Sequence, residues 1–558
     1  MLQDKSRILV GWILALGTGA VTLLVTPYSA FDPVNVPKMS LLVFLAFVVG
    51  SILILNLGLI KSSAARLPMI LTGFLILDLF LILLSSPQNK TEQFYGIAGR
   101  NTGFLTYLSL CLLMVAAIIF SEKTMVSLFV RQALFTGTAL VLYGFIQSLG
   151  KDIFPWISAY SNPVIGTFGN PDFQSAFMGI FGTICFGLAF SKSRVLIKAL
   201  YFIMFISATF VAYKTHAFQG LVCLAAGVGF VLFLHVLALK KKFLTSGVTA
   251  IGCISILVLL LSIFNVGPLA NLLYKTSLTA RGFYWSAAIE MLKTHPFLGV
   301  GLDGYGDWYR RSRSNSAVVF NPELTTNAAH NVYLDFAANG GFPLILLYLA
   351  ILFLVLKSIL RLNRRSINHD GKFIALSGAW LAYQAQAFVS INQIGLAIWG
   401  WVLSGLIIGY EISTRTPTLI NNNYKKKESE RTSRSWTMRI SLAFALGGLT
   451  GALIGFPPYL AVSKYYESFR TSDVRYIGSA ALNRPFDRAR LIQTSKLFES
   501  KGFGKDAIRL IRIAVLEYPD STEAWQLLSN SKESTSQEKK SAESELQRLD
   551  PLNPRWNG

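Results

Sequence analysis

The chain contains little charge and few cysteines. Only 14% of its 558 residues are charged and 53% are hydrophobic, which excludes an ordinary soluble protein. It has four cysteines, and each of them falls within an apolar segment and none in a polar loop. Their spacing gives neither a disulfide framework nor a zinc site. The four are Cys111, Cys185, Cys223 and Cys253.

Apolar runs long enough to cross a bilayer recur along the chain. They predict an all-α, polytopic membrane protein with about 12 or 13 transmembrane helices. The first run has no small-residue cleavage site directly behind it, so we expect it to be a retained helix. The predicted spans are 8–26, 39–60, 67–84, 104–120, 132–149, 173–190, 195–213, 217–239, 244–265, 342–360, 373–390, 394–410 and 440–462.

The net charge of +22 reports topology and no polyanionic partner. Of the 51 Lys and Arg residues, 24 fall in short, alternate loops that would be cytoplasmic if the N-terminus is cytoplasmic. This is the positive-inside bias of membrane proteins, and we therefore expect no nucleic acid. The topology sends residues 266–341 and the C-terminal tail to the outer side of a membrane whose lipids surround the spans.

The chain divides into a membrane domain (1–462), with the large outer loop 266–341 and a cytoplasmic linker at 411–439, and a tail (463–558). In the tail Pro485, Pro519 and Pro551 recur at intervals of 34 and 32 residues. The first interval equals the period of tetratricopeptide repeats, which stack helix pairs and present a concave face. We therefore expect a small extracytoplasmic α-helical repeat domain that binds a protein partner, and the alternative is a generic helical hairpin.

The outer loop ends in Thr-Asn-Ala-Ala-His-Asn-Val-Tyr-Leu (326–334), directly before an apolar segment. His330 is one of five histidines, and it lies where a titratable base is costly unless it is used or paired. Earlier in the loop, Arg281 begins an amphipathic helix predicted over 281–293, and Gly299, Gly301 and Gly304 follow in a turn that needs close approach or positive φ. The loop thus brings a cation and a base to one outer surface.

Three motifs in this loop carry a family resemblance: Arg-(x)3-Trp from Arg281, Pro-(x)2-Gly-Val-Gly from Pro296, and His-Asn-x-Tyr-Leu from His330. Together with the segments 99–103 and 166–172, they resemble the O-antigen ligase and O-antigen polymerase superfamily over roughly residues 90–410. The resemblance implies a GT-C-type membrane glycosyltransferase. Such an enzyme moves a glycan from a polyprenyl-diphosphate carrier to a hydroxyl of a glycan, lipid or protein acceptor outside the cytoplasmic membrane.

The resemblance also implies roles for residues. Arg281 would hold the diphosphate and His330 would be the base, in a single displacement with inversion. No Asp-x-Asp or paired-carboxylate motif stands in the outer loops, so we expect a metal-independent enzyme without cofactors. The family's second arginine is missing, because its position reads Lys-Thr-His-Ala-Phe-Gln-Gly (214–220). The residues expected to bind substrate are Arg100, Lys214, His216, Gln219, Asn331 and Tyr333.

Several alternatives stay open. The enzyme is either a ligase that moves a finished glycan or a polymerase that joins repeat units, and the tail favours ligation because it offers a docking surface. A transporter of lipid-linked glycans without chemistry is a second alternative, although its charged residues would be expected within the spans. Lys214 either replaces the missing arginine or only anchors its helix at the interface. Asp172 and Asp303 are interpreted first as turn residues and second as sugar ligands, and His295 as a structural residue at a helix end.

Overall fold

The computed structural model of the protein is helical throughout the part of the chain that it describes. Helices make up this part and no strand is present in it, so the predicted all-α, multi-spanning fold is confirmed. The described residues are 2–56, 63–155, 164–191, 193–263, 276–365, 370–415, 430–471 and 473–556.

Each predicted span coincides with a helix. Within the described residues, ten helices are long and apolar enough to cross a membrane, and α5 is a shorter apolar helix. The helices at the predicted spans are α1 (Leu2–Leu23), α2 (Asn35–Leu55), α3 (Ser63–Ser85), α5 (Phe104–Phe120), α6 (Lys123–Ser148), α7 (Pro171–Ala189), α8 (Val195–Lys214), α9 (Phe218–Ala238), α10 (Lys242–Ile263), α15 (Val332–Arg365), α16 (Gly371–Val389), α17 (Ile394–Ser413) and α18 (Glu430–Gly455).

Many helix ends differ from the predicted ones by several residues: α6 begins at Lys123 where residue 132 was predicted, and a helix predicted over 281–293 runs over Thr276–Thr294. Three further differences change the layout. Helix α15 begins before the predicted span and is broken at Gly341, whose φ of 70° lies in the left-handed region. Helix α18 ends at Gly455 and a separate helix begins at Pro457, where one span to residue 462 was predicted. Residues 430–439 belong to α18, whereas they were assigned to the linker. About half of that linker (416–429) lies outside the described residues, as do the ends of two predicted spans at 57–60 and 264–265.

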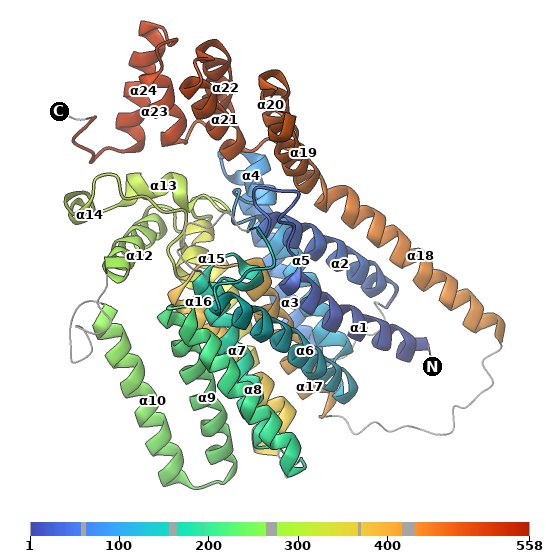
Figure 1. Ribbon diagram of the computed structural model, residues 1–558. Coiled ribbons are helices and arrows are strands. Elements are labelled where there is room, and N and C mark those ends of the chain that lie inside the picture. Colours follow the sequence, from blue (N-terminus) through green and yellow to red (C-terminus); the bar gives the residue numbers. More distant parts are fainter. Residues whose placement is uncertain are drawn as a thin grey trace.

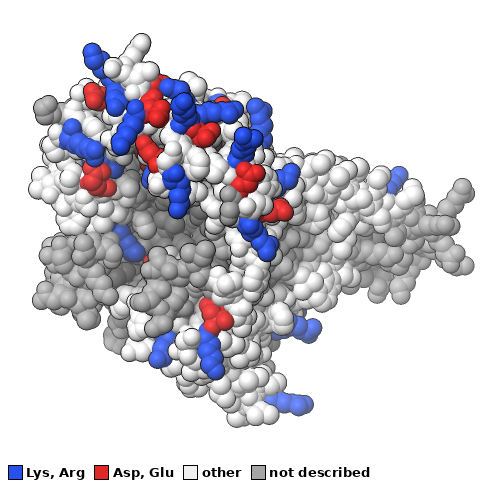
Figure 2. Space-filling model, turned by 45° about the horizontal axis from the view of Figure 1, so that its top comes forward, with Lys and Arg blue, Asp and Glu red and all other residues white. Residues whose placement is uncertain are grey.

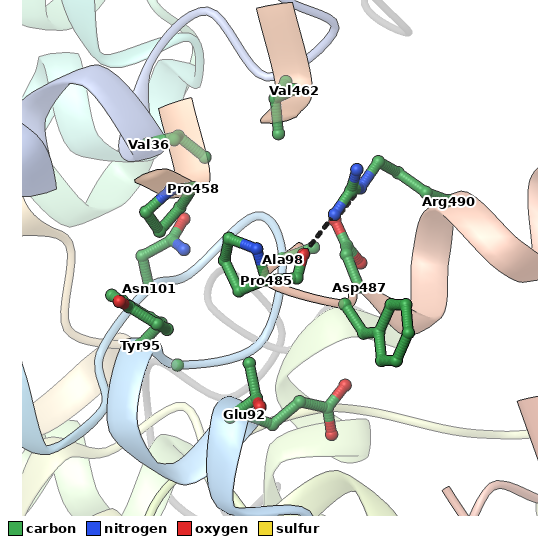
Figure 3. A pocket seen from close by; sticks show the side chains of 13 residues that line it. Val36, Glu92, Tyr95, Ala98, Asn101, Pro458, Val462, Pro485, Asp487 and Arg490 are labelled. Carbon is green, nitrogen blue, oxygen red and sulfur yellow. Dashed lines mark hydrogen bonds and ion pairs between the residues drawn. The ribbon is translucent and has the colours of Figure 1, made fainter. Parts of the chain in front are cut away.

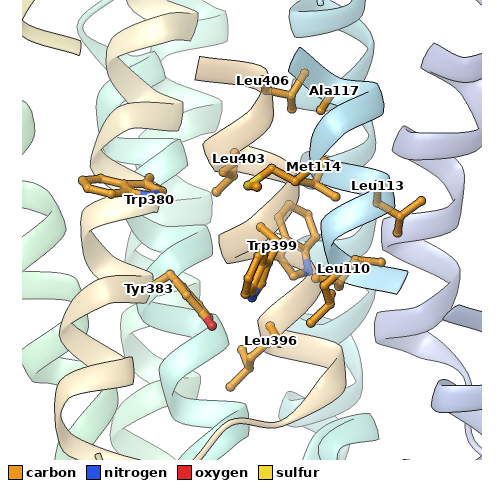
Figure 4. Packing of buried hydrophobic residues seen from close by; sticks show 14 of the residues in the cluster. Leu110, Leu113, Met114, Ala117, Trp380, Tyr383, Leu396, Trp399, Leu403 and Leu406 are labelled. Carbon is orange, nitrogen blue, oxygen red and sulfur yellow. The ribbon is translucent and has the colours of Figure 1, made fainter. Parts of the chain in front are cut away.

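Helix α17 forms the centre of the membrane domain, because every residue in its apolar stretch is buried. Leu396, Leu403 and Leu406 of α17 pack between α5 and α16, as Figure 4 shows. A Cβ on Gly405 would lie 2.4 Å from a backbone oxygen of α5, so this glycine permits close helix packing. The buried Trp399 indole is paired, because it donates to the Thr22 hydroxyl (2.8 Å).

The outer loops form a layer of short helices on one end of the bundle (Figure 1). This layer contains α4 (Lys90–Tyr95), the 3-10 turn η2 (Gly166–Phe168), α12 (Thr276–Thr294), α13 (Tyr305–Ser312) and α14 (Asn315–Phe320). Side-chain caps define several starts: the Asn89 side chain accepts two backbone N–H groups at the start of α4, and the Ser314 side chain accepts one at α14.

The tail covers this layer as a row of helices: α19 (Pro457–Thr471), α20 (Val474–Ala481), α21 (Arg488–Ser500), α22 (Gly504–Glu517), α23 (Thr522–Asn530) and α24 (Ser536–Leu549). Helix α21 packs against α22 and α23 against α24, and Pro519 and Pro551 follow the second helix of each pair. Ala507 and Ala514 are buried between them. Assignment to the tetratricopeptide family stays a prediction. Figure 2 shows basic and acidic side chains mixed over this end of the molecule.

Candidate active site

A buried arginine joins the outer loop at 85–103 to the end of the large outer loop 266–341. Arg100 is only 3% exposed, and its guanidinium donates to the Asn327 carbonyl (2.5 Å) and to Asp335 (3.5 Å). Burial lowers the pKa of Arg100, but Asp303 and Asp335 outweigh burial and raise it. The Arg100 side chain is therefore charged and connects two outer loops. Both of its terminal nitrogens are hydrogen-bonded to protein groups.

Asp303 is the second element of this link. Its carboxylate accepts the backbone N–H groups of Ile97 (3.0 Å) and Thr102 (3.3 Å) and the Thr102 hydroxyl (2.7 Å). Asp303 itself has a φ of 54°, and it is buried. These bonds favour a positioning role for Asp303 over direct contact with a sugar.

The glycine-rich turn before Asp303 packs on the first half of α15. Gly299 and Gly301 have φ values of 58° and 101°, as the sequence predicted. A Cβ on Gly299 would lie 2.3 Å from the backbone of Asn339 and Gly340. The Val300 N–H also donates to the Ala338 carbonyl (2.8 Å). The turn therefore fixes α13 relative to α15, which follows directly after His330.

His330 lies between the outer loop and α15 in a left-handed conformation, with a φ of 52°. Its ring stacks on Tyr284 of α12, with 5.4 Å between the ring centroids. Burial, together with the positive charges of Arg281 and Arg100, lowers the pKa of His330 to about 4. The imidazole is therefore neutral at neutral pH and has a lone pair that can accept a proton.

Arg281 lies one turn before Tyr284 on α12 and is the less constrained of the two arginines. Burial lowers its pKa, and the charges of Asp172 and Tyr284 oppose this change. Among the described residues its guanidinium makes neither a hydrogen bond nor an ion pair, whereas that of Arg100 makes both. Arg281 thus presents a cation beside a neutral histidine, and the first turn of α7 adds the Asp172 carboxylate to the same region.

The turn between α8 and α9 carries three of the predicted substrate-binding residues. Gln219 is 6% exposed, and neither atom of its amide has a hydrogen-bond partner among the described residues. His216 is exposed with a φ of 57°, and the Lys214 ammonium lies 5.7 Å from the centre of the Phe210 ring. Ser175 of α7 holds this turn, because its hydroxyl accepts the Gly220 N–H (3.0 Å) and donates to the Ala217 carbonyl (3.0 Å).

The other two predicted residues begin α15. The Asn331 side chain accepts the N–H groups of Tyr333 (3.0 Å) and Leu334 (3.1 Å), which is the geometry of a helix cap. The Tyr333 hydroxyl donates to the Gln384 side-chain oxygen (2.8 Å). The other amide atom of Gln384, the nitrogen, is buried and has no partner among the described residues.

The structure thus brings His330 together with Tyr284 and with the charges of Arg281 and Arg100, whereas the Tyr333 hydroxyl is directed at Gln384. It leaves Lys214 and His216 without a direct contact to His330 in the described part of the chain. Sequence reasoning missed Tyr284, Asp335 and Gln384. Two of these had a signal: Tyr284 is three residues after Arg281 on the same helix face, and Asp335 is a charge in the first turn of a predicted span. Gln384 had none, because only packing brings α16 to Tyr333.

Comparisons with known proteins bear on part of this site. Residues 199–349 match a family model described as O-Antigen ligase. This stretch includes Lys214, Gln219, Arg281 and His330, but it contains neither Arg100 nor the tail. No curated protein matches the chain. The match supports a glycosyltransferase-like function of the ligase or polymerase type, and the family implies a lipid-linked glycan substrate in a membrane. The segment that carries Arg281 and His330 is therefore similar to the O-antigen ligase domain.

Proposed function

We propose that the protein transfers a glycan from a polyprenyl-diphosphate carrier to an acceptor hydroxyl on the outer side of a bacterial cytoplasmic membrane. The observation that carries this proposal is the pair formed by Arg281 and His330: a cation without a protein partner among the described residues stands beside a histidine that is kept neutral. A departing diphosphate needs a cation to stabilise its charge, and an acceptor hydroxyl needs a neutral histidine to take its proton.

The reaction follows from these two groups. The acceptor oxygen attacks the anomeric carbon of the donor while His330 takes the hydroxyl proton. The bond between that carbon and the diphosphate oxygen breaks, and Arg281 stabilises the charge on the departing polyprenyl diphosphate. One displacement inverts the anomeric centre. The chemistry needs no metal, because the guanidinium carries the positive charge that offsets the leaving group.

The other predicted residues have supporting roles in this proposal. The buried amide of Gln219 has unused hydrogen-bonding capacity, which suits the hydroxyl groups of a sugar. Tyr333 orients Gln384, whose free nitrogen is a second donor for the glycan. Asn331 caps α15 and positions His330 by fixing the start of that helix. Arg100 is assigned to positioning, because its nitrogens are already used by Asn327 and Asp335.

Ligation and polymerisation share this chemistry and differ only in the acceptor. We favour ligation, because the tail lies on the layer of outer helices that includes α4 and α13 and offers a surface there for an acceptor (Figure 1). The same placement supports an outer tail opposite a cytoplasmic N-terminus. A protein partner of the helix pairs in the tail belongs to this proposal as well.

The test uses protein purified into liposomes and sugar-labelled lipid-linked glycans extracted from the host membrane. We expect His330→Ala to keep less than about a tenth of the transfer rate, because a positioned base contributes ~10²–10⁴-fold. Arg281→Lys should also lose most activity, since a lysine cannot reproduce the bidentate fork. The control is His235→Ala, which removes an imidazole near the opposite end of α9. Full activity of His330→Ala would refute the assignment, and release of glycan without an acceptor product would indicate transport or hydrolysis.

A further inference from the structure

Buried charges join the tail to the outer loops. Arg488, the first residue of α21, pairs with Glu92 of α4 (3.3 Å) and also donates to Asp307 of α13. All three side chains are less than 15% exposed. Burial raises the pKa of Glu92 and neighbouring carboxylates add to this, although Arg488 opposes it. A single tail arginine thus holds two carboxylates from two different loops.

A second anchor lies at the end of the tail. Asp550 is fully buried, and it accepts from Arg310 (2.7 Å) and from Arg313 (2.6 Å), both in the outer loop. Arg311 pairs with Asp520 of the tail (3.1 Å). Burying charges is costly unless each has a partner, so these pairs form only if the tail stays docked on the loops.

The tail and the outer loops meet at an interface, which we call the seam. The seam contains a small cavity between the tail and the outer loop at 85–103, as Figure 3 shows. Its lining includes Pro485, Asp487 and Arg490 of the tail and Tyr95 and Asn101 of the loop. Its volume is about 40 Å³, which is room for water and too little for a sugar. We therefore interpret the seam as a packed interface and not as a second ligand site.

Glu92 and Asp307, the two carboxylates that Arg488 holds at the seam, are connected to the candidate active site. Helix α4, which carries Glu92, leads into the loop 96–103. Asp307 lies in the first turn of α13, four residues after Asp303, and Asp303 holds this same loop through Ile97 and Thr102.

From that loop the connection reaches the base. Arg100 donates to the carbonyl of Asn327, three residues before His330, and its charge helps to keep His330 neutral. The path from the tail to His330 therefore alternates hydrogen bonds and ion pairs with short stretches of backbone.

We infer that the tail is a positioning element of the site, in which Arg488 holds the loops that carry Arg100 and Asp303 in register with His330. The inference rests on the proposed function, because it assigns His330 the role of base. It also gives the tail a partner within its own chain, namely the surface formed by α4 and α13.

The test compares Arg488→Met with Arg488→Lys and with Arg512→Met, a matched control. Arg512 is in the same tail and has an ion pair with Glu538, but it is 46% exposed and contacts neither loop. We expect Arg488→Met to lower kcat at least tenfold while the KM for the lipid-linked donor changes less than threefold, since Arg281 is not moved. The lysine form should recover part of kcat, and Arg512→Met should behave as wild type. If Arg488→Met does not insert into the membrane, Arg488→Lys takes its place in the comparison with Arg512→Met, and the expected loss of kcat is then smaller.

Two readouts separate a positioning role from simple destabilisation. Without substrate, amide exchange in the peptides 96–103 and 324–331 should become faster in Arg488→Met and remain unchanged in Arg512→Met. The acid limb of kcat/KM should lie at higher pH than in the wild type, because Arg100, the smallest of the three causes that lower the pKa of His330, no longer acts at the same distance.

The outcomes distinguish the inference from the proposed function. Faster exchange in a protein that shows no transfer would leave the coupling intact and refute the function. Normal exchange and normal kcat in an active Arg488→Met enzyme would refute the coupling.

Discussion

The neutral state of His330 leads to a prediction about the pH dependence of catalysis. An unperturbed histidine loses half of its neutral form near pH 6.5, whereas the pKa of His330 is about 4. At about 1.4 kcal/mol per factor of ten, protonating His330 in the empty site costs roughly 3 kcal/mol more than in water. The base therefore stays available over the whole range in which an ordinary histidine would be protonated.

The assay is the pH profile of transfer at low and at saturating donor. In kcat/KM, which reports the free enzyme, we expect one acid limb near pH 4 and no loss of rate between pH 8 and pH 5. In kcat, which reports the enzyme with donor bound, the limb should lie at higher pH. The reason is that the diphosphate neutralises Arg281, and Arg281 is one of the two cations that lower the pKa of His330.

Two variants check the cause of the shift. The residual activity of Arg281→Gln should show the acid limb of kcat/KM at higher pH than wild type, because one of the two cations is gone. The residual activity of His330→Gln should show no such limb. If wild-type kcat/KM instead falls through pH 6 to 7, either His330 is not the base or its burial in the working enzyme is lost.

Three further predictions concern other parts of the chain. Lys214→Ala should weaken donor binding, seen as a higher KM, if the lysine replaces the missing family arginine, and leave KM unchanged if it only anchors α8. Asp550→Asn should destabilise the docked tail by about 3–5 kcal/mol, because Arg310 and Arg313 lose a buried partner, and limited proteolysis should then release the tail while an exposed-site control such as Glu545→Gln stays resistant. A reporter that works only outside the cytoplasm should be active after Gly558 and silent within residues 425–427; equal signals would refute the odd number of crossings.

The docked tail changes how its surface is interpreted. The sequence suggested a repeat domain whose concave face is open to a partner. In the structure, the side that carries Arg488 and Asp550 is already occupied by the outer loops. A protein partner would therefore have to use the remaining faces of the helix pairs, and it would contact a segment that is coupled to the site.

The sequence by itself determined the all-α membrane fold, because apolar runs of bilayer length have only one way to satisfy their backbone in lipid. It also proposed Arg281 and His330 as candidates, since both lie in the large outer loop and both begin motifs that resemble the O-antigen ligase superfamily. The positive φ of Gly299 and Gly301 was predictable for a local reason, namely that glycine tolerates this conformation.

Only the tertiary structure decided how these residues are used. In the sequence, Arg100 was expected to bind substrate. In the structure it links two loops, because it forms hydrogen bonds with Asn327 and Asp335. These partners are more than 200 residues away along the chain. The low pKa of His330 depends on burial and on two arginines from other elements, which no local pattern encodes. The pairing of Arg488 with Glu92 could not be predicted either, because buried ion pairs depend on which surfaces meet when the chain packs.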